Sequence, residues 1–191
     1  SRTGASPLAE MMENLTKKPN ISVITCMGNE ANNKCHYKGT VMSALVPDVM
    51  EINVDGTGKG FTMEIWADSL DILSVSIESP SGEYVPRIPA RMGASMEYTF
   101  LYEGSTVTVD YQITENVAGM EVIFVRLKTP VEGTWKFYIY SLTNIKGSYN
   151  AWLPLKQFSG QDISVAVFLP ARSKFVFIFY NRDFVPDILR H

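Results

Sequence analysis

The sequence predicts a mainly β protein: an antiparallel β-sandwich of jelly-roll type, preceded by a short α/β segment. Over residues 46–168, strand signals recur about every 8 to 12 residues, with turn residues between them. Apolar and polar residues alternate within these segments, which places one set of side chains inward and the other outward. No helical pattern separates the strands, and many short strands without intervening helices indicate an antiparallel sandwich.

The composition limits the classes of partner. Of 191 residues, 46% are hydrophobic and 19% are charged, a balance that favours a packed fold over disorder. The net charge is −3, and nothing indicates a nucleic-acid or anionic-membrane partner. No apolar run approaches the roughly 20 residues of a membrane span. The chain begins without an initiator Met or a signal peptide, so we expect a fragment or a processed piece.

Residues 1–45 predict a helix followed by a strand. Ser6 is a good N-cap and Pro7 suits the first helical position. Residues 21–27 are a short, β-branched apolar run that ends at Gly28, which predicts a strand buried on both faces. The helix is indicated by an apolar stripe at helical spacing, formed by Leu8, Met11, Met12 and Leu15.

The alternation over residues 46–168 separates core from surface positions. Trp135 is in phase with its apolar neighbours, so we predict that it lies in the core. Trp66 is out of phase with its apolar neighbours and is the best candidate for an exposed tryptophan. The predicted inward set includes Phe61, Met63, Ile65, Val107, Val109, Tyr111, Ile113, Trp135, Phe137 and Ile139.

Residues 169–191 depart from this pattern as a divergent strand and tail. Residues 174–180 are apolar on both faces, which predicts a buried central strand, or an aggregation-prone strand if it stays unpaired. We expect the run at residues 21–27 to be disordered, to pair with residues 174–180, or to exchange between chains in a strand-swapped homodimer.

One segment offers a candidate for catalysis. Gly28-Asn29-Glu30 directly follows the apolar run, and a side-chain amide just past a strand end can donate a hydrogen bond to a developing oxyanion. Gly28 permits a ligand to approach the backbone closely. The same tripeptide is also a common turn, so these residues alone leave both interpretations open.

A longer stretch resembles a known family. Ile21-Ser22-Val23-Ile24-Thr25-Cys26-Met27-Gly28-Asn29-Glu30, followed by Asn32, Asn33 and His36, resembles the oxyanion-asparagine block of subtilisin-like serine proteases. The helix that begins Gly4-Ala5-Ser6-Pro7-Leu8 resembles what precedes that block in the clostridial branch, which includes the germination proteases. The resemblance extends to about residue 170 through segments such as Phe61-Thr62-Met63-Glu64-Ile65-Trp66, Tyr98-Thr99-Phe100-Leu101-Tyr102-Glu103, Gly133-Thr134-Trp135 and Ala151-Trp152-Leu153-Pro154.

This resemblance implies a role and a site. In that branch a jelly-roll domain is inserted in the catalytic domain just after the oxyanion block, which would make residues 1–45 a remnant of the catalytic domain and residues 46–168 the insert. Asn29 would be the oxyanion-hole donor. The family's triad settings, an Asp on a strand, Gly-His-Gly-Thr and Gly-Thr-Ser, do not occur here, so we expect no hydrolysis by this chain alone.

The resemblance also implies partners and a location. The expected partners are the remainder of a subtilase catalytic domain or the cleaved propeptide, which the insert would brace or regulate. The expected location is the bacterial cytoplasm or the spore. No cofactor is expected.

Other candidates are weaker. Asp55, Asp68 and Asp71 do not follow a calcium-loop pattern, so no metal site is predicted. Cys26 lies in the apolar run as an inert thiol. Cys35 and His36 are sequence neighbours whose side chains would point apart on an extended chain, which argues against a catalytic dyad. The rival to the protease interpretation is a free-standing module that binds carbohydrate or peptide through Trp66 and neighbouring tyrosines.

Overall fold

A computed structural model describes residues 7–24, 33–56, 58–67, 72–91, 93, 95–113, 121–142, 146–155 and 162–166. The chain divides into two compact units. One is formed from the two ends of the chain, Ser1–Asn29 and Arg172–His191, and the other is Glu30–Ala171. Of the first unit, the structure describes residues 7–24, so Asn29, Cys26 and residues 174–180 lie outside the described parts.

The described part of the first unit begins with a helix, as predicted. Helix α1 spans Pro7–Thr16. Near its end Lys17 forms an ion pair with Glu13 at 3.2 Å, and Asn20, four residues beyond the helix, adopts a left-handed φ of 62°. The strand predicted over residues 21–27 is absent from residues 21–24, where Ile24 is 92% exposed. A strand needs a hydrogen-bonded neighbour, and none of the described strands pairs with these residues.

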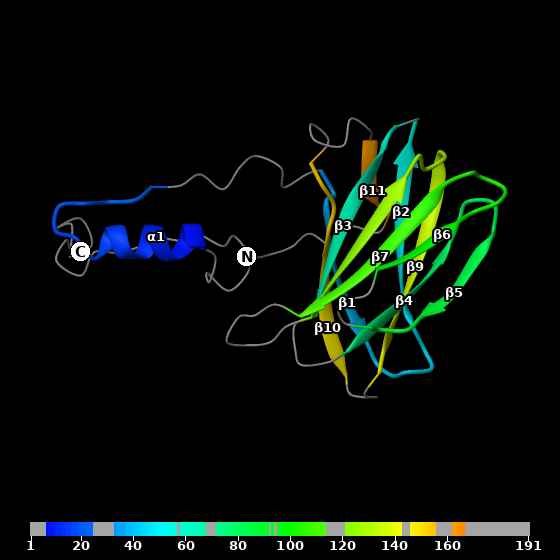
Figure 1. Ribbon diagram of the computed structural model, residues 1–191, viewed down its shortest axis with the longest axis horizontal. Helices are drawn as coiled ribbons and strands as arrows, with labels where there is room; N and C mark the ends of the chain where they lie inside the picture. The colour runs from blue at the N-terminus through cyan, green and yellow to red at the C-terminus, as the bar shows by residue number, and fades with distance from the viewer. Residues whose placement is uncertain are drawn as a thin grey trace, which may run out of the picture. The chain divides into compact units, whose positions relative to one another are not determined.

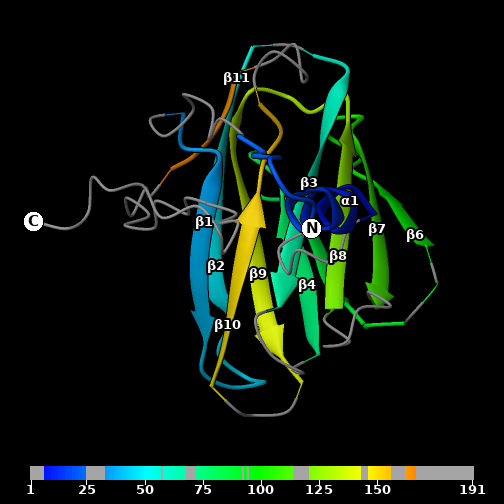
Figure 2. The same ribbon diagram turned by 90° about the vertical axis from the view of Figure 1, so that its left-hand side faces the viewer.

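The second unit is a sandwich of two antiparallel sheets (Figures 1 and 2). The six-stranded sheet has the order β1-β10-β3-β8-β7-β6, and the five-stranded sheet has the order β11-β2-β9-β4-β5. The strands are β1 His36–Val41, β2 Asp48–Asp55, β3 Gly60–Ala67, β4 Leu73–Glu78, β5 Tyr84–Ile88, β6 Ser95–Thr99, β7 Thr106–Ile113, β8 Glu121–Lys128, β9 Gly133–Ser141, β10 Gly147–Trp152 and β11 Asp162–Val165.

The pairing is nested, because the first strands pair with the last ones in reverse order. β1 pairs with β10, β2 with β9 and β3 with β8. Without the β6–β7 hairpin and β11, which extend the sheets at their edges, the orders are β1-β10-β3-β8 and β2-β9-β4-β5, the arrangement of a jelly roll. The predicted fold class is therefore confirmed. The six-stranded sheet already includes β1, which precedes residue 46, where the sequence placed the start of the sandwich.

The core between the sheets contains the side chains that the alternation placed inward. Phe61, Met63 and Ile65 of β3 are buried, as are Val107, Val109 and Tyr111 of β7 and Trp135, Phe137 and Ile139 of β9. Trp135 is fully buried, as predicted, and packs edge-to-face on Phe100 with ring centroids 5.1 Å apart. Alternation at a period of two therefore identifies the core of this sandwich.

A polar tie joins the two sheets at one end. Asp48, the first residue of β2, accepts hydrogen bonds from Tyr37 of β1 at 3.0 Å and from Tyr149 of β10 at 2.7 Å. Burial and the neighbouring Asp48 carboxylate raise the pKa of Tyr37 to about 12 and raise that of Tyr149 still further. Gly39 is required beside the tie, since a Cβ there would lie 2.3 Å from the Asp48 Oδ2 and 2.4 Å from the Tyr149 ring.

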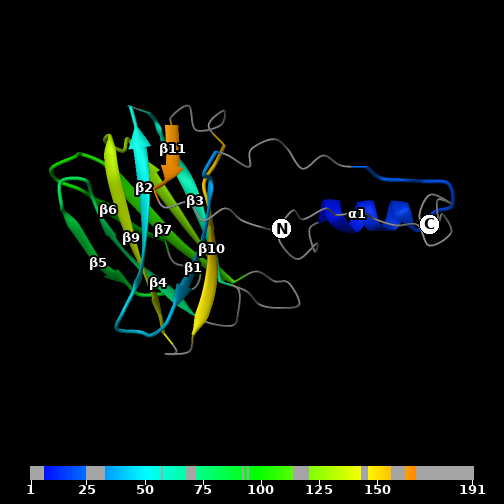
Figure 3. The ribbon, with the colours of Figure 1, turned by 180° about the vertical axis from the view of Figure 1, so that it is seen from behind.

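The chain enters and leaves the sandwich at adjacent points (Figure 3). The backbone N–H of Val165 in β11 donates to the carbonyl of Lys34, just before β1, at 3.0 Å. The N–H of Leu153, just after β10, donates to the carbonyl of Cys35 at 2.8 Å. The two ends of the sandwich are therefore held side by side by backbone hydrogen bonds.

Candidate interaction surfaces

The outer face of the six-stranded sheet carries a group of aromatic side chains. We call His36, Trp66, Phe124 and Trp152, with Glu64 and Asn150 among them, the aromatic face. The pairing registers bring them together: His36 lies opposite Trp152, Asn150 opposite Trp66, and Glu64 opposite both Trp152 and Phe124. The set therefore crosses β1, β10, β3 and β8 as one surface.

Ring stacking and hydrogen bonds arrange the aromatic face. The His36 and Trp152 rings are stacked, with centroids 4.0 Å apart and planes 20° apart. His36 Nε2 and Asn150 Oδ1 are hydrogen-bonded at 2.8 Å, and Trp66 Nε1 donates to Glu64 Oε2 at 2.9 Å. Stacked, flat side chains of this kind give a partner protein large contact areas at a low cost in side-chain entropy.

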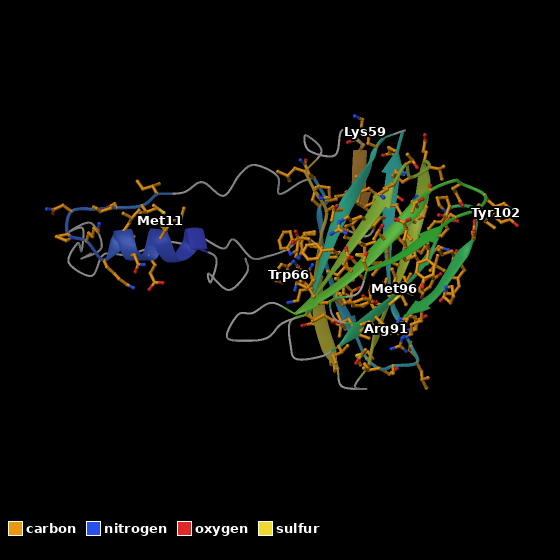
Figure 4. All side chains as sticks on the ribbon, in the orientation of Figure 1. Met11, Lys59, Trp66, Arg91, Met96 and Tyr102 are labelled. Atoms are coloured by element: carbon orange, nitrogen blue, oxygen red, sulfur yellow. The ribbon has the colours of Figure 1, made fainter. Side chains whose placement is uncertain are left out.

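Trp66 lies on the outer face, as its phase predicted, but it is half-buried. Figure 4 labels Trp66. The most exposed of the three tryptophans is Trp152, whose side chain is 40% exposed. The sequence favoured Trp66 over Trp152 as the exposed tryptophan, although the strand alternation contains the signal for Trp152. Tyr149 and Ala151 are buried, which places Asn150 and Trp152 on the opposite side of β10.

The outer face of the five-stranded sheet carries a different group. We call Tyr84, Tyr138 and Tyr140, with Glu78, Lys136 and Arg87, the tyrosine face. Tyr138 and Lys136 both donate to the Glu78 carboxylate, the latter at 2.9 Å. Tyr84 donates to Ser76 Oγ at 2.7 Å, and Ser76 Oγ donates to Tyr140 at 3.3 Å. Each of the three phenols is thus bonded to a side chain of β4, Tyr84 and Tyr140 to Ser76 and Tyr138 to Glu78.

Arg87 of β5 completes the tyrosine face. Its guanidinium lies over the Tyr140 ring, 4.7 Å from the centroid, where the cation and the ring attract one another. Arg87 also donates to Ser74 Oγ at 2.5 Å and to the backbone carbonyl of Ala44 at 3.1 Å. Ser74 and Ser76 are buried beneath these larger side chains.

The hydrogen bonds shift the ionisation of two groups on the tyrosine face. The bonds from Tyr138 and Lys136 lower the pKa of the Glu78 carboxyl, because they favour its charged form. The same carboxylate raises the pKa of Tyr138 to about 12, mainly through their hydrogen bond. At neutral pH the face therefore presents the protonated Tyr138 phenol beside the ionised Glu78 carboxylate.

The remaining sequence candidates do not form a catalytic or metal site in the described structure. The Cys35 Sγ contacts the carbonyl of Asn33, whereas the His36 ring stacks on Trp152, so the two do not form a dyad. Asp55 lines a polar hollow of about 290 Å³ with Asp162 and Lys34, while Asp68 and Asp71 lie outside the described residues. Among the residues that are described, no group of three or more His, Cys, Asp or Glu side chains could hold a metal.

Asn29 lies outside the described residues, so its role as an oxyanion donor stays a prediction. Within the parts of the chain that are described, no helix has the length and apolarity needed to cross a bilayer.

The fold is similar to part of one solved protease structure. No protein family model matches the sequence, and no curated protein matches it significantly. Among solved structures, the chain is similar to the CspB protease of Clostridium perfringens, with a TM-score of 0.74 and 19% sequence identity. The match covers 87% of this chain and 34% of that one, so this chain spans about a third of its length. The likeness shows a fold shared with part of a clostridial protease, which agrees with the class of protein that the sequence resembles.

Proposed function

We propose that the chain is a non-catalytic part of a subtilisin-like serine endopeptidase, in which the sandwich is an inserted domain that braces or regulates the catalytic domain. The main observation in support is the hydrogen bond between Val165 N and Lys34 O at 3.0 Å, which holds the two ends of the sandwich together. An inserted domain has to leave its host close to where it enters, and adjacent ends meet that requirement. Along the sequence, the second unit is also preceded and followed by segments of the first.

The absence of hydrolysis follows from the side chains that a triad requires. A serine protease needs a histidine that accepts the proton of the attacking serine, held by a carboxylate. The sequence has two histidines, His36 and His191, and neither lies in a Gly-His-Gly-Thr setting. His36 is stacked on Trp152 and hydrogen-bonded to Asn150, an arrangement that does not resemble a general base beside a nucleophile.

The aromatic face is the surface we assign to contact with the catalytic domain or its propeptide. It begins at His36, directly after the point where the chain enters the sandwich, and it contains the exposed ring of Trp152. Tryptophan is enriched among the side chains that contribute most to protein–protein binding. A domain held at this edge and covered on this face would brace its host.

An active-site serine probe tests the proposal directly. The purified 191-residue chain, shown to be folded by circular dichroism, is incubated with a fluorophosphonate probe and with casein, and trypsin serves as a positive control. We expect neither labelling nor casein cleavage. Labelling of a serine by the folded chain, together with casein cleavage that is lost when that serine is changed to alanine, would overturn the proposal.

A further inference from the structure

We propose that the tyrosine face, on the outer side of the five-stranded sheet, binds a neutral saccharide. Three tyrosine rings from two strands surround hydrogen-bonding side chains on one surface. Tyr84 comes from β5, and Tyr138 and Tyr140 come from β9, with β4 between them. Saccharides combine flat C–H faces with rows of hydroxyl groups, and a surface of aromatic rings and directional polar groups matches both features.

The strand registers place the polar groups in a row beside the rings. Tyr84, Glu78, Lys136 and Glu51 lie opposite one another across β5, β4, β9 and β2. The next positions along β4 and β9 pair Ser76 with Tyr138 and Ser74 with Tyr140. A ring seated on the tyrosines would therefore have the carboxylate and ammonium groups of this row within reach along its edge, while the buried Ser74 and Ser76 hydroxyls hold Arg87, Tyr84 and Tyr140 from below.

The rings are held in place before any ligand arrives. Tyr84 packs edge-to-face on Tyr138, with centroids 5.8 Å apart, and its hydroxyl lies 3.5 Å from that of Tyr140. Tyr138 is fixed by Glu78, and Tyr140 by Ser76 and Arg87. Because these side chains are already ordered, binding would immobilise little more than the ligand. Tyr84 is 48% exposed, so the surface remains accessible to solvent.

The charges on the tyrosine face favour a neutral ligand. Glu51 and Glu78 are balanced by Lys136 and Arg87, and Glu78 is directly paired with Lys136 at 2.9 Å. The Tyr138 and Tyr84 phenols stay protonated at neutral pH, because the pKa of Tyr138 is raised to about 12 and that of Tyr84 is also raised. A phosphorylated ligand or a nucleic acid would meet no excess of positive charge here.

This proposal does not depend on the proposed function. The tyrosine face and the aromatic face lie on the outer sides of opposite sheets, so covering the aromatic face leaves the tyrosine face open. The two proposals can also fail separately. The glycan test can succeed for a chain that is not part of a protease, and it can fail for a chain that is.

The test uses the full 191-residue chain in native gels that contain hydroxyethyl cellulose, laminarin, xylan or mannan, together with a glycan array. We expect retardation by at least one neutral glycan, and a binding constant about tenfold weaker or worse in Tyr84→Ala, as for the loss of an interface anchor. Tyr102→Ala is the matched control, because Tyr102 is 83% exposed on the turn between β6 and β7 (Figure 4) and its side chain is not part of the tyrosine face. Its backbone N–H, which the substitution keeps, donates to Glu83 at 3.1 Å.

Several outcomes would overturn the proposal. One is the absence of a signal with every gel and array glycan. Another is equal weakening in Tyr84→Ala and Tyr102→Ala. A third is binding that is lost in Trp66→Ala but kept in Tyr84→Ala, which would place the site on the aromatic face. Thermal unfolding of each variant establishes that the sandwich is intact, and Tyr84→Phe, which retains the ring, should keep most of the affinity.

Discussion

The two outer faces of the sandwich are built by the same strand alternation, yet their side chains are held in different ways. On the aromatic face, His36 and Trp152 are joined by flat stacking at 4.0 Å. On the tyrosine face, each phenol is hydrogen-bonded to a neighbouring side chain, and Glu78 accepts from two donors. The exposed Trp152 ring gains free energy when a partner removes it from water, whereas the hydrogen bonds of the tyrosine face hold its rings and polar groups in place before a ligand arrives.

This difference suggests a division of roles between the sheets. A surface of stacked rings suits a permanent protein neighbour, because its benefit comes from buried apolar area. A preorganised polar surface suits a ligand that binds and leaves. Both faces depend on the same core, so a change in the core should affect them together, whereas changes at the edges should separate them.

The largest expected effect is that of Trp135→Ala, which should disturb both faces at once. Trp135 is fully buried against Phe100, and its Nε1 donates to the carbonyl of Val131 at 3.1 Å. Removing such a side chain leaves a cavity and costs about 3–5 kcal/mol in the free energy of unfolding. Urea unfolding followed by far-ultraviolet circular dichroism measures it. A loss below about 1 kcal/mol would contradict the claim that both faces depend on the core around Trp135.

A smaller and more local effect is expected from Tyr149→Phe. This change removes one of the two hydrogen bonds that Asp48 accepts and should cost about 1–3 kcal/mol, because the remaining polar group is partly buried. Amide hydrogen exchange should speed up mainly in β1 and β10, which carry the aromatic face, and little in β4 and β5. Tyr102→Phe, at an exposed position, serves as the control and should change neither quantity.

The sequence predicted the sandwich well because its strands have one buried side. Each inward position, such as Met63 or Val109, is marked by the polar residues that flank it. The run at residues 21–27 is the opposite case, and of it the structure describes residues 21–24 alone. Its side chains are apolar on both faces, a pattern that is typical of a strand but names no partner, and residues 21–24 pair with none of the described strands.

The candidate surfaces were harder to predict than the core. The alternation placed Trp66 outward, and the structure agrees. It could not show that Trp152 meets His36 or that Glu78 meets Tyr138, since these contacts join residues far apart in the chain. Strand register decides them, and the order of strands in a jelly roll is set by long-range pairing. The role of Asn29 as an oxyanion donor stays a prediction from the sequence, because Asn29 lies outside the described residues.

The smallest expected effect is that of Glu78→Gln on how the stability of the protein depends on pH. On the tyrosine face, the pKa of Glu78 is lowered in the folded protein, first by the hydrogen bond from Tyr138 and then by Lys136. A lowered folded pKa means that the ionised carboxylate contributes stability above the unfolded value of about 4.3, and that this contribution is lost as the pH falls through the folded pKa. Glu78→Gln should therefore flatten the acid side of the stability curve.

Glu78→Gln should also change the stability at high pH, because Tyr138 loses its bond to the Glu78 carboxylate. Tyr138 has a folded pKa raised to about 12, so its bond contributes stability that is fully present below about pH 10 and is lost as the pH rises through the folded value. Glu78→Gln removes the carboxylate and should lower the pKa of Tyr138, which ultraviolet titration of the phenols detects. Glu64→Gln, the matched change on the aromatic face, should leave the phenol titration unaltered. Equal shifts in the two variants would show that the network around Glu78 is not what sets this pKa, and the contrast between the faces would then rest on stacking alone.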